Sequence, residues 1–268
     1  ASIPLSEATS YPGSIQVGDF NGDGAVDMLI QDGTSASVTL WANNGNGVFT
    51  NAGQAVAPVT SLQINYASFR VADFDNDGDL DLYQRIPGSS NDLYLANNGS
   101  GQFTVGNLPL IDSGTTSHNS IQIGDFNNDG AVDILTQEGN TGTSVTLWLN
   151  NGSGVFSNAG EAVAATTNFT ISSSALRVAD IDNDEDLDLY LRVNGTSNDI
   201  FFANNGVGQF VSSALPLVDT GVSTASYLQV GDFNNDGAID ILTQEGGIGA
   251  AVTLWLNDGN GYFTSNLN

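Results

Sequence analysis

One nine-residue pattern, D-x-[DN]-x-D-G-x-x-D, constrains this chain more than any other feature. It first occurs at residues 19–27, inside the stretch VGDFNGDGAVDMLI. Apolar and β-branched residues flank it on both sides, so we expect a loop between two strands rather than between two helices. Three carboxylates and an amide this close together repel one another unless a cation lies among them. Alternating Asp and Asn oxygens with one backbone carbonyl are ligands that suit Ca²⁺.

The pattern occurs five times, with Glu in place of Gly in the fourth copy, and its spacing organises the whole chain. The first aspartates of the five copies stand at intervals of 54, 52, 55 and 52 residues. A nearly constant step of this size indicates a repeat architecture, so we expect one continuous domain over residues 1–268. In each loop the expected Ca²⁺ ligands are positions one, three, five, seven and nine, position seven acting through its backbone carbonyl. These residues are Asp19, Asn21, Asp23, Ala25, Asp27, Asp73, Asp75, Asp77, Asp79, Asp81, Asp125, Asn127, Asp129, Ala131, Asp133, Asp180, Asp182, Asp184, Asp186, Asp188, Asp232, Asn234, Asp236, Ala238 and Asp240.

Each repeat has the pattern of four short strands. In the first repeat we expect strands at 14–19, 27–31 and 37–42, and a fourth that opens at Phe49. The Asn-Gly sequence within residues 43–47 is typical of a tight hairpin between the third and fourth strands. No segment shows a sustained period of 3.6 residues. Four antiparallel strands, repeated five times, predict an all-β fold and favour a five-bladed β-propeller over a sandwich.

The paired motifs resemble FG-GAP (VCBS-type) repeats, the calcium-carrying blades of integrin α-chain propellers and of many secreted bacterial proteins. Besides the loop pattern, the resemblance rests on N-[ND]-G-x-G-x-F, which occurs at residues 43–49, 97–103, 150–156, 204–210 and 257–263. It covers nearly the whole chain. It implies a propeller, Ca²⁺ in the first hairpin of each blade with all five loops as metal sites, and an extracellular binding role. Related propellers commonly have six to eight blades, whereas this chain has five repeats.

The fourth loop departs from the family pattern, because Glu185 stands where the glycine belongs. A left-handed backbone at a residue other than glycine costs roughly 1 kcal/mol. We therefore expect Glu185→Gly to tighten Ca²⁺ binding in loop four. Loop two offers four carboxylate ligands and keeps Gly78, so we expect it to bind most tightly, since more ligand charge raises affinity.

The composition is strongly acidic, and the loops explain most of the acidity. The chain has 30 acidic and 4 basic residues, a net charge of −26, and 20 of the acids lie in the five loops. Five Ca²⁺ ions would bring the charge to about −16, and that surplus argues against nucleic acid or anionic membranes as partners. An apolar content of 40% excludes an acidic disordered chain.

The absence of cysteine and of long apolar runs excludes disulfides and membrane-spanning segments. The chain has no Cys, hence no disulfide framework, and no apolar run long enough to span a membrane. Since Ca²⁺ is abundant outside cells, even weak loops would be filled there, and we expect a secreted protein.

The repeats alternate between two types. The first, third and fifth (A repeats) share GDFNxDGAxDxL, and the second and fourth (B repeats) share VADxDNDxDLDLY. All four basic residues lie in the B repeats: Arg70, Arg85, Arg177 and Arg192. Two interpretations stay open for these arginines, namely structural pairing with carboxylates or a cationic pocket for an anionic sugar.

The two ends of the chain complement each other. Leu-Pro-Leu follows the fourth strand of each B repeat, and Ile3-Pro4-Leu5 matches it near the N-terminus. The sequence ends almost where the fifth repeat would need such a segment. We therefore expect the N-terminal segment to complete the last blade, which would close the ring of a monomer and leave no open sheet edge.

The functional prediction is recognition without catalysis. The only histidine, His118, lies in a polar link, and the acids outside the loops mostly recur in register rather than forming one asymmetric constellation. Equivalent repeated surfaces suit multivalent binding, so we favour a lectin-like carbohydrate-binding module. A protein-adhesion module and a calcium-stiffened scaffold are the alternatives. The candidate ligand-binding residues are aromatic side chains of the long links, where function is often found: Tyr11, Tyr66, Phe169 and Tyr227.

Overall fold

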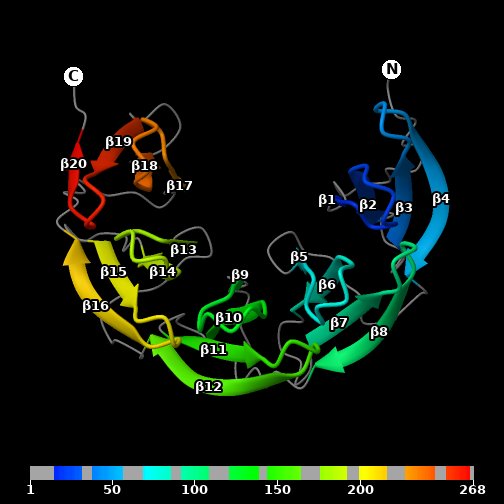
Figure 1. The fold of residues 1–268 in the computed structure, drawn as a ribbon, viewed down its shortest axis with the longest axis horizontal. Coiled ribbons are helices and arrows are strands. Elements are labelled where there is room, and N and C mark those ends of the chain that lie inside the picture. The colour runs from blue at the N-terminus through cyan, green and yellow to red at the C-terminus, as the bar shows by residue number, and fades with distance from the viewer. Residues whose placement is uncertain are drawn as a thin grey trace. The chain divides into compact units, whose positions relative to one another are not determined.

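The computed structural model describes ten segments of the chain, which hold the strands and the loops between them. They are residues 15–31, 38–56, 69–85, 92–108, 121–138, 144–163, 176–191, 199–215, 227–244 and 252–265. The chain divides into two compact units: Ala1–Ser113 with Asn150–Phe156, and Gly114–Leu149 with Ser157–Asn268. Within the described segments every regular element is a strand (Figure 1).

The first unit contains the first two repeats. The first repeat forms β1 (Ile15–Gly18), β2 (Asp27–Gln31), β3 (Val38–Asn43) and β4 (Phe49–Val56). The second forms β5 (Phe69–Ala72), β6 (Asp81–Gln84), β7 (Asp92–Asn97) and β8 (Phe103–Leu108). Each repeat is an antiparallel sheet in chain order, and one parallel bridge between Val56 and Phe103 joins β4 to β8.

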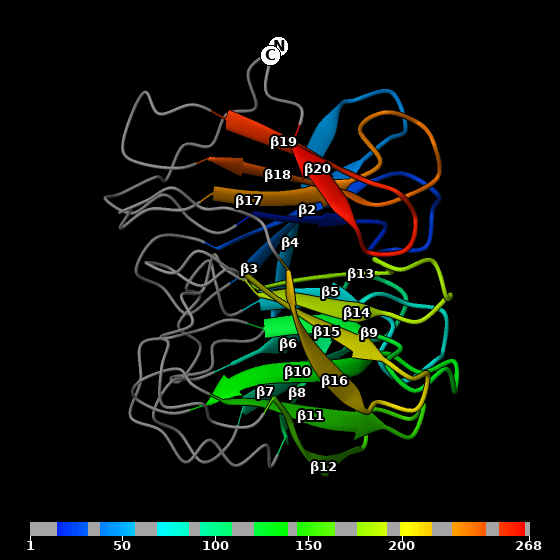
Figure 2. The same ribbon diagram turned by 90° about the vertical axis from the view of Figure 1, so that its left-hand side faces the viewer.

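The second unit contains the other three repeats, except for Asn150–Phe156 of the third repeat, which belong to the first unit. The third forms β9 (Ile121–Gly124), β10 (Asp133–Glu138), β11 (Ser144–Asn150) and β12 (Phe156–Val163). The fourth forms β13 (Leu176–Ala179), β14 (Asp188–Leu191), β15 (Asp199–Asn204) and β16 (Phe210–Leu215). The fifth forms β17 (Tyr227–Gly231), β18 (Asp240–Gln244), β19 (Val252–Asn257) and β20 (Phe263–Ser265), which lie side by side in Figure 2.

The all-β prediction is confirmed by the described residues. Each repeat supplies four antiparallel strands in the order of the sequence, as propeller blades do. In the first repeat β2 has the predicted bounds, and β1, β3 and the start of β4 agree within one residue. The nine-residue pattern occupies the turn between the first and second strands of every repeat, so all five loops lie at the same place in their sheets.

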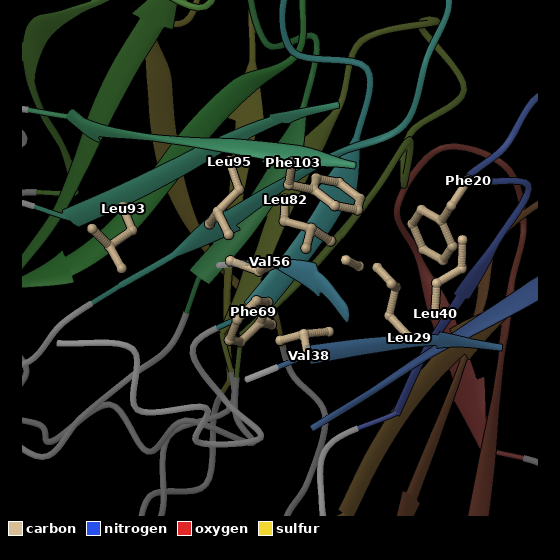
Figure 3. Packing of buried hydrophobic residues seen from close by; sticks show 11 residues of the cluster. Phe20, Leu29, Val38, Leu40, Val56, Phe69, Leu82, Leu93, Leu95 and Phe103 are labelled. Carbon is tan, nitrogen blue, oxygen red and sulfur yellow. The ribbon is translucent and has the colours of Figure 1, made fainter. Parts of the chain in front are cut away.

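The core of the first unit lies between its two sheets. Side chains from both repeats meet there, among them Phe20, Leu29 and Leu40 of the first repeat and Leu82 and Leu95 of the second (Figure 3). The ring of Phe20, which stands directly after the first loop ligand, packs edge-on against Phe103. The loop is thus anchored to the apolar interior by the residue beside its first ligand.

Two further clusters form the core of the second unit. One joins the third and fourth repeats, and the other joins the fourth and fifth through Ile181, Tyr190 and Trp255. Trp148 and Trp255 are buried, and their indole Nε1–H groups donate to Thr136 and Thr243 Oγ1 at 2.9 and 3.1 Å. These two tryptophans therefore fill the core, at a strand position that Leu95 and Phe202 occupy in the B repeats.

A buried asparagine links consecutive repeats. It ends the third strand, and its side-chain Nδ2 donates to the backbone carbonyl of the residue after the first loop ligand in the preceding repeat. The pairs are Asn97 to Phe20 O, Asn150 to Phe74 O, Asn204 to Phe126 O and Asn257 to Ile181 O, at 2.7–2.9 Å. In the first repeat Asn43 Nδ2 donates to Val26 O of its own repeat. Loops one to four are therefore each fastened to the repeat that follows.

Contacts from an A repeat to the following B repeat depend on a glycine. A Cβ at Gly18 would lie 2.6 Å from Leu80 Cδ1, and one at Gly124 would lie 2.5 Å from Leu187 Cδ1. The aromatic or aliphatic residue next to the first ligand is likewise covered by the following repeat: Phe20, Phe74 and Phe126 are fully buried. Phe233, in the fifth repeat, is 46% exposed, and no further repeat follows it in this sequence.

No helix of the described residues has the length and apolar character needed to cross a membrane.

Candidate metal-binding loops

All five loops share one backbone framework held by their own side chains. The first aspartate accepts hydrogen bonds from two backbone N–H groups, those of positions five and six. In loop one these are Asp23 N to Asp19 Oδ1 at 3.2 Å and Gly24 N to Asp19 Oδ2 at 2.8 Å. The other four loops repeat both bonds at 2.8–3.2 Å. The position-five aspartate in turn accepts from the N–H of position seven, for example Ala25 N to Asp23 Oδ1 at 2.9 Å.

The aspartate at position nine is fully buried in every repeat and joins the loop to the sheet. Asp81 Oδ2 accepts from Phe74 N at 3.1 Å, and its Oδ1 accepts from Asn97 N at 2.8 Å. Asp27, Asp188 and Asp240 make the same two bonds in their repeats. The second strand starts at this residue. One carboxylate therefore connects the start of the second strand to the loop and to the hairpin turn.

In the two B repeats the structure brings three predicted ligands together. Asp73, Asp75 and Asp81 offer carboxylate oxygens within 4.8 Å of one another, and Asp180, Asp182 and Asp188 do the same. One oxygen in each cluster, Asp75 Oδ1 and Asp182 Oδ1, is buried and has no hydrogen-bond donor in the described part of the chain. A buried acceptor without a donor is costly. An oxygen-liganded cation such as Ca²⁺ would satisfy it, so the residues present fit that group.

The electrostatics of these clusters also favour a positive charge. Burial raises the pKa of Asp188 to about 7, with repulsion from Asp182 and Asp184 adding to the effect. Burial likewise raises the pKa of Asp81, against the lowering effect of its hydrogen bonds from Asn97 N, Tyr94 and Phe74 N. An adjacent cation favours the charged carboxylate and would oppose these shifts.

The A repeats have an asparagine at position three, and its amide is used inside the loop. Asn127 Oδ1 accepts from Asp129 N at 3.1 Å while its Nδ2 donates to Asp129 Oδ2 at 2.9 Å. Asn234 makes the same pair of bonds with Asp236, and Asn21 accepts from Asp23 N. Among the described acidic residues, the three-carboxylate clusters therefore occur in loops two and four, and the A loops keep the same backbone with less charge.

The two B loops differ at one side chain outside the loop. Tyr94, on β7, places its hydroxyl 3.0 Å from Asp75 Oδ2 and 2.8 Å from Asp81 Oδ2. The register of β6 with β7 pairs Tyr83 with Tyr94, and that of β14 with β15 pairs Tyr190 with Phe201. Phe201 therefore stands at the equivalent position of the fourth repeat, without a hydroxyl. The sequence motifs did not single out Tyr94, because it lies 19 residues from Asp75 on another strand.

Glu185 has the left-handed backbone that its position in the pattern requires. Its φ is 73°, while glycine holds the place in the other four loops, as Gly78 does with φ 94°. Its N–H still donates to Asp180 Oδ2 at 3.1 Å, so the loop keeps its framework at the cost of strain.

We expect Glu185→Gly to stabilise the folded protein by up to about 1 kcal/mol, because the strain of a side chain at positive φ is relieved. Part of this gain is offset by the greater freedom of glycine in the unfolded chain. Binding of Ca²⁺ at loop four would also tighten if the metal-free loop leaves the left-handed conformation at Glu185, because binding would then have to restore it. Thermal denaturation with and without Ca²⁺ separates the two effects, and Gly78→Glu in loop two is the reciprocal control. An unchanged Tm under both conditions would contradict the strain.

Three of the four arginines of the B repeats lie within the described residues. Arg177 donates to the backbone carbonyls of Leu176 and Leu228, both at 2.8 Å, and so ties the fourth repeat to the fifth. Arg70 donates to Phe69 O at 2.6 Å, and Arg85 is buried. For Arg177 the partners are carbonyl groups rather than the carboxylates that the structural interpretation anticipated. Arg192 lies outside the described residues.

The candidate ligand-binding aromatics belong to the links between repeats. Tyr11, Tyr66, Phe169 and also His118 lie outside the described residues. Tyr227 begins β17, and its side chain is not described. Their assignment to a ligand face stays a prediction.

Fold and loops together define a class: an all-β repeat protein with four-stranded antiparallel sheets, consistent with a β-propeller. The FG-GAP-like repeat family matches this chain at residues 19–83 and 137–191. The resemblance found in the loop motifs is thereby confirmed. Among curated proteins, none matches the chain in sequence.

Solved structures of similar fold come from several settings. An Agrocybe aegerita lectin that recognises non-reducing terminal N-acetylglucosamine is 22% identical, with a TM-score of 0.70 over 94% of this chain. The chain spans 64% of the length of that lectin. The Photorhabdus luminescens Tc holotoxin pore is 19% identical, with a TM-score of 0.60 over 98% of this chain and 12% of that one. The V. cholerae biofilm matrix protein Bap1 is 15% identical, with a TM-score of 0.51 over 98% of this chain and 40% of its own. These likenesses support the fold.

Proposed function

We propose that this protein is a secreted, non-catalytic carbohydrate-binding module that engages glycans through several repeats at once. The observation that carries the proposal is the equivalence of the repeats: the same loop framework recurs five times with the same hydrogen bonds. A catalytic centre is usually one asymmetric constellation, whereas repeated surfaces multiply weak sites. The fold shared with an N-acetylglucosamine-recognising lectin supports the ligand class.

Ca²⁺ has a structural role in this proposal, with about one ion per repeat. In the B repeats it would be held by Asp73, Asp75 and Asp81 and by their counterparts in loop four. When bound, the ion supplies positive charge that neutralises the buried carboxylates and fixes the loop. The loop residues connect the first and second strands of each repeat. Because the ion would fix this loop, glycan binding would depend on Ca²⁺ indirectly, through the fold.

The finer architecture that we propose is a five-bladed propeller within a single monomeric chain, with the N-terminal segment completing the last blade. Five four-stranded repeats support this arrangement. Deletion of residues 1–8 is then expected to lower the Tm, because the last blade would lose the segment proposed to complete it. A truncated monomer with an unchanged Tm would contradict the closure.

The test of function compares a dense glycan surface with the free sugar. We expect binding to immobilised N-acetylglucosamine-bearing and other glycans to exceed the affinity for the free monosaccharide by roughly 10² to 10⁴, because several repeats bind together. Surface plasmon resonance at decreasing glycan density measures this, and the advantage is expected to vanish at low density. Single variants Tyr11→Ala, Tyr66→Ala, Phe169→Ala and Tyr227→Ala test the link aromatics, with Tyr262→Ala, on an exposed turn side chain, as the control.

An adhesion module is the second candidate, since integrin-type propellers carry similar loops. It predicts capture of one extracellular protein and no response to any glycan surface. Absence of both activities in folded, Ca²⁺-loaded protein would leave a purely structural module.

A further inference from the structure

We infer that Tyr94 is a positioning residue of the loop-two metal site, and that Phe201 at the equivalent position weakens the loop-four site, separately from any effect of Glu185. The inference rests on the proposed calcium sites and goes beyond them by assigning a role to a residue outside the nine-residue loop. The tyrosine hydroxyl lies within 3.0 Å of one carboxylate oxygen of each of two predicted ligands, Asp75 and Asp81.

The position of the hydroxyl decides which ligand oxygen is left for a cation. Tyr94 contacts Asp75 through Oδ2, and Oδ1 of the same carboxylate is buried without a donor. On Asp81 the hydroxyl shares Oδ2 with the N–H of Phe74, while Oδ1 accepts from Asn97 N. Tyr94 therefore bridges the two carboxylates on one side and orients the free oxygen of Asp75. Partners of this kind orient ligands, and their removal typically weakens metal affinity by about 10- to 100-fold.

The ring that carries this hydroxyl is held from two sides. Phe74 packs edge-on against it, with ring centroids 6.3 Å apart. On another side lies the turn at Gly154, where an added Cβ would come within 3.2 Å of the Tyr94 ring, and Gly154 N donates to Phe74 O at 3.0 Å. A hydroxyl on a fixed ring is pre-organised, so the bridge requires no rearrangement when a cation binds.

The fourth repeat provides the natural comparison. Its cluster of Asp180, Asp182 and Asp188 has the same spacing, and Asp182 Oδ1 is buried without a donor, as Asp75 Oδ1 is. The strand register places Phe201 where Tyr94 stands. The carboxylates of loop four therefore lack the hydroxyl bridge. The two loops have the same four aspartate ligands, and inside the loop they differ at Phe74 and Ile181 and at Gly78 and Glu185.

The experiment exchanges the two side chains in the full-length protein. Calcium is titrated by calorimetry into metal-free wild type, Tyr94→Phe, Phe201→Tyr and the double exchange. We expect Tyr94→Phe to weaken one site by about tenfold or more and Phe201→Tyr to tighten one site by a similar factor, with the number of bound ions unchanged. The double exchange is expected to show both changes together, a weaker loop-two site and a tighter loop-four site. Both variants keep the aromatic ring, so folding is preserved.

Two readouts separate this role from a merely structural one. Tm in chelator reports the contribution of the hydroxyl to the metal-free fold, whereas the isotherm reports ligand positioning. A lower Tm for Tyr94→Phe with an unchanged isotherm would overturn the inference while leaving the calcium sites intact. A wild-type protein that takes up no Ca²⁺ would overturn the proposed sites as well as the role of Tyr94.

Discussion

Removal of Ca²⁺ by a chelator is expected to lower the free energy of unfolding by several kcal/mol. A ligand that binds only the folded state at 100 times its Kd contributes about 2.7 kcal/mol per site. The two B-loop clusters alone would then contribute about 5 kcal/mol, which approaches the entire stability of many domains. Two buried oxygens without donors and the raised pKa of Asp188 indicate that the metal-free loops are strained electrostatically. Thermal denaturation with and without chelator measures the effect.

The A loops suggest a matched control for this experiment. Asp75→Asn and Asp182→Asn give loops two and four the position-three residue of Asn21, Asn127 and Asn234 without changing the size of the side chain. We expect the double variant to lose less stability in chelator than the wild type, because it carries fewer buried charges. Mg²⁺ should restore little stability, since it requires a tighter octahedral shell. Identical melting curves with and without chelator would show that the loops are acidic turns and nothing more.

Asn204→Ala is expected to destabilise the protein by about 3 kcal/mol or more. The buried Nδ2 of Asn204 donates to Phe126 O of the preceding repeat and to Leu187 O of its own. Truncation leaves both carbonyl oxygens without this donor, and each buried group that loses its partner costs about 1–3 kcal/mol. Denaturant unfolding monitored by tryptophan fluorescence measures the loss.

The equivalent residue of the first repeat is the control. Asn43 Nδ2 bonds to Val26 O within its own repeat, in an exposed setting where water can replace it. Asn43→Ala should therefore cost about 1 kcal/mol or less. Equal losses for the two variants would show that the asparagine acts within its hairpin turn and not between repeats.

The strands and loops could be predicted because their signals are local. An Asx position every second residue, a glycine at the turn and β-branched flanks act within a dozen residues, and β2 has the predicted bounds. The asparagine that bonds to the preceding repeat is the first residue of N-[ND]-G-x-G-x-F, yet that motif predicts only a turn. Its bond reaches a carbonyl about 77 residues earlier, as in Asn97 to Phe20 O. Such a partner follows from the packing of repeats and not from spacing.

The structural interpretation of the arginines expected carboxylate partners, which is wrong for Arg177. In an acidic chain a carboxylate is the expected neighbour, but Arg177 lies part-buried at the boundary of two repeats, where carbonyl groups are the acceptors within reach. Burial there lowers the pKa of its guanidinium. The loop-two tyrosine was missed for a related reason, since its role depends on strand register and not on its neighbours in sequence.

The glycine before the first ligand limits how a chain of this kind can change in length. A repeats have Gly18 and Gly124 there, each against a leucine of the following B repeat at a distance that excludes a Cβ. B repeats have Ala72 and Ala179, and the A repeats that follow them carry Val132 or Ile239 in place of that leucine. Duplication of a single B repeat would set an alanine against a leucine, whereas duplication of an A-B pair recreates only contacts already present. During evolution such a chain can therefore gain or lose repeats most readily in pairs.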